Sequence, residues 1–453
     1  MLNEVTPVTA RTIAYARLAH DAADFPDLVP TELETGPLDP RDAALAHAIH
    51  DTVIRRWWTL QSVVAPFMNK PFLEFEPGVR AALLAGAAQL LFFDRVPPHA
   101  AISETVEWTK RAIRPGAGGL VNAVLRRVSE LLGTERTYRD EFTWGRDEIP
   151  LADGRALVLA SPVLPENGLD RTAAAVSIAA PLLEAWRDEH GEKAWRKLAL
   201  HTLAVPSVTM NLRHAQSAVP ETEPHDREGF AHYAGPMPAL GDLLASRSDV
   251  WVQDAASGEA VASIADLDLG KATPVIVDLC AGKGTKTRQL ARTFPHAEIV
   301  ATDTDAPRLA VLKRVFEGHY EDGKGVRVLE FADVLDDCLG RADLVLLDVP
   351  CSNTGVLARR PEAKYRPMTK QRDRLTDTQR QIVADAIRLL APKGKILYST
   401  CSLQREENTE IARWATTWHG FSLARERTTL PEGLPGDAPT RYHDGSYSVL
   451  LER

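Results

Sequence analysis

Residues 342–365 read ADLVLLDVPCSNTGVLARRPEAKY, and this stretch decides the fold of the second half of the chain. Residues 344–347 form an uninterrupted apolar run, which is typical of a strand buried on both faces of a parallel sheet. Asp348 and Cys351 follow directly after the run. Because ligands bind at the carboxyl ends of parallel strands, the stretch predicts a carboxylate and a thiol at a binding crevice.

Strands and helices alternate from residue 273 onward, which predicts a doubly wound α/β sheet. The expected strands are residues 275–279, 299–303, 326–331, 344–347 and 395–399, and the expected helices are residues 286–294, 306–317 and 376–390. A second thiol, Cys401, follows the strand at 395–399. Two strand-end cysteines, one of them close to an aspartate, favour covalent chemistry on an electrophilic ring.

The composition sets limits on what the protein is. A chain of 453 residues is too long for one core, so two or three domains are expected. The net charge of −9 does not exclude nucleic-acid binding, which depends on local basic patches. The four cysteines form neither a disulfide framework nor a CxxC pair, and no apolar run reaches membrane-spanning length. We expect a cytoplasmic monomer with no metal and no membrane partner.

The first part of the chain is predicted to be helical. Apolar residues at helical spacing mark residues 11–23, 40–68, 79–93, 100–113 and 119–132, which together form a compact bundle. Residues 135–170 are polar and punctuated by prolines, so we expect a linker there. A helix at 182–203 and a strand at 208–213 follow, whereas residues 214–246 show little periodicity.

Residues 278–287, DLCAGKGTKT, form a glycine-containing turn between a predicted strand and a predicted helix. The glycines let the backbone approach a ligand, and the helix N-terminus favours a negative group such as the carboxylate of methionine. A dinucleotide fingerprint needs a glycine where Thr287 stands, and a phosphate-binding P-loop needs one where Thr285 stands. These two departures leave S-adenosylmethionine as the favoured ligand.

Acidic residues near successive strand ends support the same cofactor. Asp303 is placed to bind both ribose hydroxyls, and Asp333 is expected to end the third strand beside the adenine. The alternative interpretation is that these acids only cap helices.

The set of two thiols and one carboxyl group matches the needs of methylation at carbon 5 of cytosine. That carbon becomes nucleophilic only after a thiolate adds to carbon 6 of the ring. A carboxyl group at N3 withdraws charge during the addition, and a base must later remove the hydrogen on carbon 5. Asp348, Cys351 and Cys401 supply these three functions.

Two motifs resemble those of the NOL/Sun family of RNA cytosine-C5 methyltransferases. Residues 398–408, YSTCSLQREEN, are similar to its nucleophile motif, and residues 348–355, DVPCSNTG, to its second-cysteine motif. The resemblance implies that Cys401 is the nucleophile, that Cys351 assists product release and that Asp348 contacts the cytosine. It also implies cofactor contacts from Cys280, Ala281, Gly282, Lys283, Gly284, Thr285, Lys286, Asp303, Asp333 and Asp348. Lys283 stands where proline is common in the family, and Thr285 where glycine is common.

The stretch 94–128 resembles the NusB-type RNA-binding domain that precedes the catalytic part in bacterial small-subunit rRNA members of the family. The resemblance implies four parts: a NusB-like bundle at 1–135, a linker at 136–170, a small α+β module at 171–249 and a Rossmann-like class I methyltransferase domain at 250–453. Small-subunit rRNA is therefore the expected substrate. A tRNA cytosine-C5 methyltransferase, an amino-group methyltransferase and a catalytically idle assembly factor are the alternatives.

Basic residues in two regions are candidates for RNA contact. Residues 359–374 carry seven basic against two acidic side chains beside the predicted active site, and polyanion binding explains this contrast with the acidic chain. The predicted contacts are Arg359, Arg360, Lys364 and Arg366 there, and Lys110, Arg111, Arg114, Arg126 and Arg127 in the helical region. The alternative is that they are ordinary solvated charges.

Overall fold

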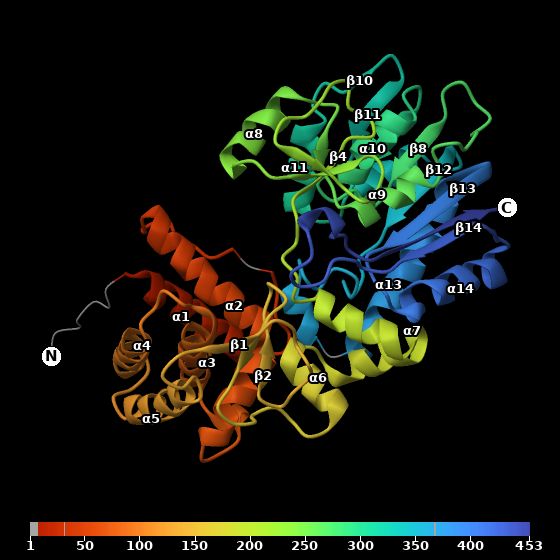
Figure 1. Ribbon diagram of the computed structural model, residues 1–453. Coiled ribbons are helices and arrows are strands. Elements are labelled where there is room, and N and C mark those ends of the chain that lie inside the picture. The colour runs from red at the N-terminus through yellow and green to blue at the C-terminus, as the bar shows by residue number, and fades with distance from the viewer. Residues whose placement is uncertain (1–7, 31, 367) are drawn as a thin grey trace. The chain divides into compact units, whose positions relative to one another are not determined.

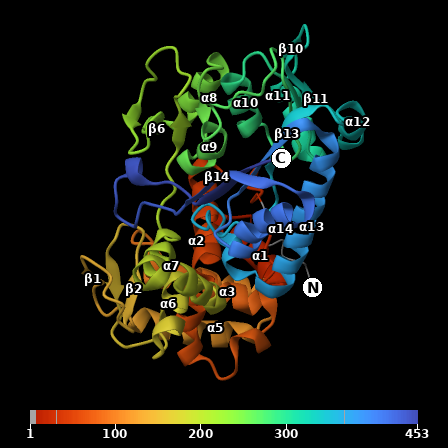
Figure 2. The same cartoon turned by 90° about the vertical axis from the view of Figure 1, so that its right-hand side faces the viewer.

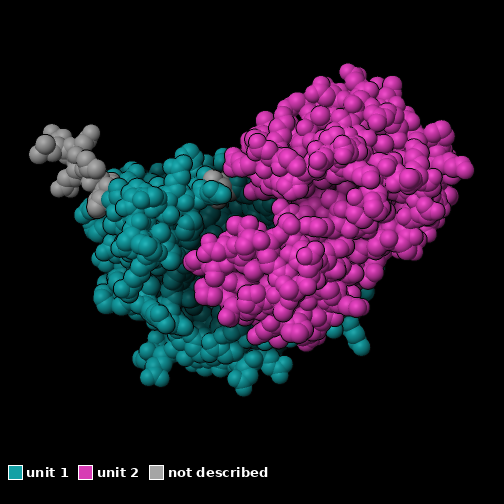
Figure 3. All heavy atoms as spheres, turned by 90° about the horizontal axis from the view of Figure 1, so that it is seen from above, with its two compact units in different colours: residues 1–205, 357–368, 434–437 teal, residues 206–356, 369–433, 438–453 magenta. Residues whose placement is uncertain are grey.

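The computed structural model describes residues 8–30, 32–366 and 368–453, and the side chains of residues 368–372 lie outside this description. Two residues of the predicted basic run, Lys370 and Arg372, fall in that last group. The chain forms two compact units (Figure 3). Unit 1 contains residues 1–205, 357–368 and 434–437, and unit 2 contains residues 206–356, 369–433 and 438–453.

Unit 1 begins with the predicted helical bundle, coloured red to orange in Figure 1. Its helices are α1 (Ala10–Asp24), α2 (Pro40–Val64), α3 (Pro77–Phe92), α4 (Pro98–Ala112) and α5 (Ala117–Glu130). Helix α3 is buried along almost its whole length, because it is apolar on every side and the other helices surround it. The side chain of Asp39 caps the start of α2 by accepting from the N–H groups of Arg41 and Asp42. The predicted all-α bundle is confirmed.

The stretch predicted as a linker is instead a folded part of unit 1. It carries the three-stranded antiparallel sheet of β1 (Thr137–Arg139), β2 (Glu148–Pro150) and β3 (Ala156–Val158), followed by α6 (Gly168–Val176) and α7 (Ala180–His201). Ile149 and Leu157 are fully buried in the core of the bundle. Each strand is only three residues long, which is too short for a periodic signal to mark it.

Unit 2 contains two sheets. The smaller has the antiparallel order β5-β6-β4-β7, formed by β4 (Thr209–Asn211), β5 (Thr222–Pro224), β6 (Phe230–Tyr233) and β7 (Trp251–Val252), with helices α8 (Met237–Ser246) and α9 (Ala255–Ala262). Residues 214–246, which showed little periodicity, thus supply two strands and a helix. The helix at residues 180–201 belongs to unit 1, so the small module starts later than the predicted residue 171.

The larger sheet has eight strands in the order β10-β11-β9-β8-β12-β13-β15-β14. They are β8 (Val275–Asp278), β9 (Glu298–Ala301), β10 (Tyr320–Glu321), β11 (Lys324–Val328), β12 (Ala342–Asp348), β13 (Leu390–Thr400), β14 (Ser422–Thr429) and β15 (Ser446–Glu452). The five central strands from β11 to β13 are parallel, as predicted. The antiparallel additions β10, β14 and β15 were not predicted.

Helices cover both faces of the large sheet. They are α10 (Thr285–Thr293), α11 (Ala306–Val315), α12 (Phe331–Asp337), α13 (Met368–Leu389) and α14 (Thr409–His419). Leu344 and Leu346 of β12 share a core with residues of α10 and α11, whereas Val345 and Leu347 share one with residues of α13 and α14. Figure 2 shows α13 and α14 side by side. Apolar residues on both faces explain the uninterrupted run in the sequence. None of the described helices is long and apolar enough to cross a membrane.

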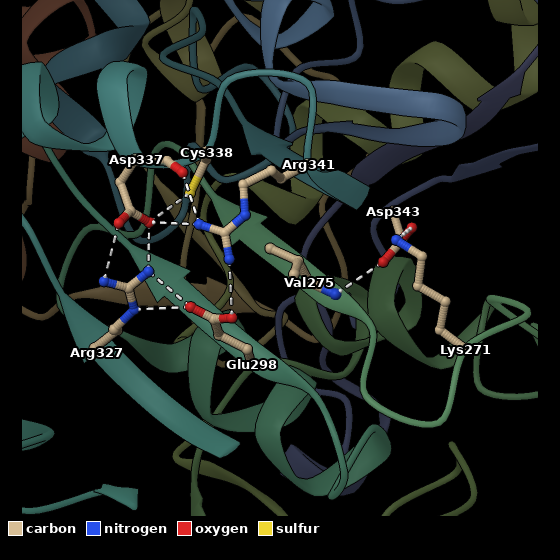
Figure 4. A network of polar contacts seen from close by, with 8 residues as sticks. All are labelled: Lys271, Val275, Glu298, Arg327, Asp337, Cys338, Arg341 and Asp343. Carbon is tan, nitrogen blue, oxygen red and sulfur yellow. Dashed lines mark hydrogen bonds and ion pairs between the residues drawn. The ribbon is translucent and has the colours of Figure 1, made fainter. Parts of the chain in front are cut away.

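Charged residues at the amino ends of the parallel strands pair with one another (Figure 4). Glu298 at the start of β9 accepts from Arg327 at 2.7 Å and lies 3.5 Å from Arg341. Asp343 accepts from Lys271 at 2.7 Å and from the N–H of Val275 at 2.9 Å. The buried Cys338 joins this network through the carboxylate of Asp337, which fits a structural cysteine.

Candidate functional site

The register of β12 with β13 sets the geometry at the opposite, carboxyl ends of the strands. The two strands are parallel, and Asp348 at the end of β12 lies opposite Ser399. The hydroxyl of Ser399 donates to Oδ1 of Asp348 at 3.0 Å, and Nζ of Lys286 donates to Oδ2 at 2.8 Å. The predicted carboxylate is thus held by two donors, one of them from the glycine-containing turn.

Lys286 keeps its charge at this position. Burial lowers its pKa, but the carboxylate of Asp348 more than offsets this effect, so the pKa is raised overall. The ammonium group also donates to Oγ of Ser257 at 3.1 Å. The result is an ion pair that fixes the orientation of the Asp348 carboxylate.

The two predicted cysteines come together just beyond the strand ends. Sγ of Cys351 lies 3.1 Å from Sγ of Cys401, which in turn donates to Oδ1 of Asn353 at 3.2 Å. The hydrogen bond with Cys401, burial and the nearby charge of the Cys401 sulfur all raise the pKa of Cys351. Asn353 has φ of 62° and donates its side-chain amide to the backbone carbonyl of Cys351 at 3.1 Å, so it links the Cys351 loop to the Cys401 sulfur.

A buried carboxylate joins the two cysteine loops. Glu407 accepts from the N–H of Ser352 at 2.8 Å and from the hydroxyl of Ser402 at 2.8 Å, and these residues follow the two cysteines directly. Gln379 of α13 donates to the same carboxylate at 3.1 Å. The motif YSTCSLQREEN contained Glu407, but nothing in the sequence indicated that it connects the two loops.

Gly355 is a second residue whose role the sequence did not reveal. Its N–H donates to the carbonyl of Cys401 at 2.9 Å. A Cβ atom at this position would lie 2.7 Å from that carbonyl oxygen and 2.9 Å from the carbonyl oxygen of Gly445. Only glycine therefore allows the loop after β12 to approach the loop after β13 this closely.

The glycine-containing turn lies at the end of β8 and leads into α10. Gly282 has φ of +57°, with nothing within 4 Å of where a Cβ would stand, and its N–H donates to Oδ2 of Asp303 at 2.8 Å. Oδ2 of the fully buried Asp278 accepts from Thr287 at 2.6 Å, whereas Oδ1 is buried without a hydrogen-bond partner. A free buried acceptor, an open glycine turn and the N-terminus of α10 fit the polar groups of S-adenosylmethionine.

Departures from the family pattern in this turn do not distort it. Thr285 is the first residue of α10, and both Thr285 and Lys283 are exposed, so neither position requires a proline or a glycine. Gly284 has φ of +91°, and a Cβ there would lie 2.6 Å from the ring of Phe316, so this glycine is required. Burial raises the pKa of Cys280, which remains an unreactive thiol beside the buried Ala281.

The structure corrects the predicted position of Asp333 and the predicted role of Lys364. Asp333 does not end the third strand: β11 ends at Val328, and Asp333 is exposed in the first turn of α12. Lys364 is only 1% exposed, and its Nζ donates to the carbonyls of Arg55 and Val176 at 3.3 Å. Burial lowers its pKa well below the ordinary value. Lys364 is therefore a structural residue of unit 1 and not an RNA contact.

The other basic candidates differ in how far their charge is compensated. Arg360 is exposed, and Arg359 and Arg360 line a cavity of about 240 Å³ in unit 1. Arg366 is half-buried and donates to the carbonyl of Leu28 at 3.2 Å. The helical candidates are exposed, but most of them pair with acids: Lys110 and Arg111 with Glu107, Arg114 with Glu76 and Arg127 with Glu130, while Arg126 bonds Asn122.

Comparison with known proteins identifies the family. Residues 267–427 match the family described as 16S rRNA methyltransferase RsmB/F, and residues 11–130 match the NusB family. A protein named ribosomal RNA small subunit methyltransferase B from Xanthomonas campestris pv. campestris is 31% identical over 82% of this chain and 79% of its own length. Its namesake from Vibrio cholerae serotype O1 is 31% identical over 91% and 90%. The chain belongs to the RsmB/F methyltransferase family.

Solved structures show the same fold. The structure of PH0851 has a TM-score of 0.70 at 20% identity, covering 99% of this chain and 100% of that one. A methyltransferase homologue from Pyrococcus horikoshii has a TM-score of 0.50 at 16% identity, covering 64% and 100%. The predictions of an S-adenosylmethionine-dependent RNA methyltransferase and of a NusB-like bundle joined to a Rossmann-like domain are confirmed.

The buried Asp278 makes a testable contribution to the pH dependence of stability. Burial raises its pKa to about 7 in the folded chain. The folded state therefore holds a proton that the unfolded state releases near pH 4. The free energy of unfolding should fall as the pH rises from about 4 to about 7, by on the order of 1 kcal/mol per pH unit, and should level off above that.

Asn at position 278 does not titrate and keeps an oxygen for Thr287. We therefore expect Asp278→Asn to gain stability relative to the wild type as the pH rises from 5 to 7, as measured by urea unfolding without cofactor. A stability difference that stays constant over this range would contradict the assignment.

Proposed function

We propose that the enzyme methylates carbon 5 of a cytosine in small-subunit rRNA through a covalent bond between Cys401 and carbon 6. The observation that carries this proposal is the 3.1 Å separation of the Cys351 and Cys401 sulfurs beyond the strand that ends at Asp348. Methyl transfer to an amino group requires no protein thiol, whereas carbon 5 must be activated by one. The relatives named small subunit methyltransferase B support the choice of RNA.

Cys401 is the better placed of the two thiols to attack. It is only partly buried, whereas Cys351 is buried beneath it with a raised pKa. When the Cys401 sulfur bonds carbon 6, the proton that leaves the thiol is the one that N3 gains. Asp348 is the carboxylate placed to carry it, and its two donors, Lys286 and Ser399, keep it aimed during the transfer.

When bound, S-adenosylmethionine would supply an electrophilic methyl group and would leave as its neutral thioether product. Gly282 and Asp303 are proposed to hold it, with the free oxygen of Asp278 as a further acceptor. Carbon 5 forms the new carbon–carbon bond with electrons from the enamine that the Cys401 adduct creates.

Cys351 then removes the hydrogen from carbon 5. Two of the three largest causes of its raised pKa are the hydrogen bond and the charge of the Cys401 sulfur. Both disappear once that sulfur is a neutral thioether, so Cys351 loses its own proton to solvent more readily when a base is needed. As Cys351 takes the proton from carbon 5, the bond between Cys401 and carbon 6 breaks and the N3 proton returns to Cys401 through Asp348.

The proposal also covers the cellular compartment, the oligomeric state and the state of the target base. All four cysteines are free thiols, which fits a reducing cytoplasm. We propose that the enzyme works there as a monomer. The target base must leave its stack to reach Cys401, so a loop or flipped nucleotide is the proposed substrate.

Replacing Cys351 with alanine tests the covalent mechanism. Attack by Cys401 and methyl transfer remain possible, but removal of the carbon 5 proton does not. We expect Cys351→Ala to accumulate a protein–RNA adduct that survives denaturation and migrates as a shifted band on a denaturing gel. Cys401→Ala should give no adduct. Cys338→Ala removes the buried thiol that bonds Asp337 and should behave as the wild type.

Two outcomes would contradict the proposal. One is the absence of any adduct with Cys351→Ala on undermodified small-subunit rRNA. The other is methyl transfer by Cys401→Ser at the wild-type rate, which would indicate chemistry that needs no thiolate.

A matched pair of basic residues tests the RNA contact. Arg360 is exposed beside the cysteine motif, whereas Lys364 is buried four residues later. We expect Arg360→Met to weaken RNA binding and to reduce the slope of log affinity against log salt by about 1, since one phosphate contact is lost. Lys364→Met should leave this slope unchanged and lower the melting temperature. Equal slopes for Arg360→Met and the wild type would show that Arg360 does not contact an RNA phosphate.

A further inference from the structure

Helix α2 of unit 1 is kinked at Arg56, whose backbone angles of φ −125° and ψ 21° are not helical. An unbroken helix would join the N–H of Trp58 to the carbonyl of Ile54. Here the N–H of Trp58 donates instead to Oγ of Ser177 at 2.8 Å. The kink therefore requires partners from outside the helix for its buried backbone groups.

Tyr365 supplies most of these partners. Its hydroxyl accepts from the N–H of Trp57 at 3.2 Å and donates to the carbonyl of Ile54 at 2.6 Å. The same hydroxyl lies 3.0 Å from Oγ of Ser177. The ring, 2% exposed, packs edge-on against Trp58 with centroids 5.0 Å apart. One side chain thus satisfies both a donor and an acceptor of the kink.

Neighbouring residues of the same segment make further bonds to α2. Lys364 donates to the carbonyl of Arg55 at 3.3 Å, and the Arg55 guanidinium donates to the carbonyl of Ala358. Residues 357–366 therefore belong to the helical unit, with Tyr365 in its core, although they lie between the Cys351 motif and α13 in the sequence.

Both ends of this segment lead directly into the parts of unit 2 that hold the cysteines. On one side, Gly355 donates its N–H to the carbonyl of Cys401 at 2.9 Å. On the other side, α13 carries Gln379, which donates to the carbonyl of Pro350 at 2.9 Å and to Glu407 at 3.1 Å. Displacing the segment would pull on both connections through the covalent chain.

We propose that Tyr365 is a positioning residue for methyl transfer, because its bonds to the α2 kink fix the segment whose two ends hold the cysteine loops. The helical unit then acts as a scaffold for the active-site loops in addition to any RNA contact. This inference rests on the proposed roles of Cys351 and Cys401. It does not involve the proposed cofactor site, which is formed by other residues.

The test compares Tyr365→Phe with Ser177→Ala in the full-length enzyme. Each variant removes one hydroxyl from the same kink, but only Tyr365 belongs to the segment between the cysteine loops. We expect both to lower the melting temperature. Well below both melting temperatures, Tyr365→Phe should lower the single-turnover rate of methyl transfer to rRNA at least tenfold, with an unchanged dissociation constant for S-adenosylmethionine. Ser177→Ala should keep the wild-type rate.

An insertion of Gly-Ser-Gly after Val356 provides a second measurement that does not disturb the kink. It lengthens one connection, so the same rate loss is expected with little change in melting temperature. Wild-type rates in the insertion variant, or equal rate losses in Tyr365→Phe and Ser177→Ala, would overturn the proposal. The assay measures methyl transfer to any atom of the rRNA. If the cytosine mechanism is wrong, the Cys401→Ala enzyme will still transfer the methyl group. That result is separate from the rates of the variants compared here.

Discussion

The parallel register between β12 and β13 is the constraint on which the active site depends. Asp348 lies opposite Ser399, so the loops that follow the two strands start side by side and bring Cys351 and Cys401 to 3.1 Å. A slip of two residues would keep every side chain on its own face but displace one loop by about 6.6 Å. A slip of one residue would in addition move each side chain of β12 to the wrong helical layer.

The central sheet was predictable because its strands carry a strong local signal. Buried parallel strands are apolar on both faces, and the run at 344–347 shows this directly. Strand β14 gives no such signal, since nearly all of its residues are exposed and it is recognisable only through its pairing with β15. The strands β1 to β3 were missed for another reason, since each is only three residues long. The burial of Lys364 depends on partners in α2 and α6, which its local sequence does not reveal.

The reactive groups of the site were predictable, but the groups that hold them were not. Asp348, Cys351 and Cys401 stand at strand ends, where sequence position alone indicates the binding edge. Glu407, Gln379 and Gly355 act through contacts with residues 28 to 55 positions away, or through the closeness of two backbones. Such contacts arise from tertiary packing, and a single sequence carries no pattern for them.

The charges around the glycine-containing turn show why a cationic cofactor suits this fold. Burial is the largest cause of the raised pKa of Asp278, and the carboxylates of Asp348 and Asp303 raise it further. The hydrogen bond from Thr287 and the charge of Lys286 lower it. Burial is the main reason why the folded chain keeps a proton on Asp278 near neutral pH, and the excess of carboxyl groups over the single ammonium adds to this effect. In the proposed cofactor site, a sulfonium ion with an α-amino group would bring positive charge close to these carboxyl groups. Such a site would favour S-adenosylmethionine over its neutral thioether product, which lacks the sulfonium charge.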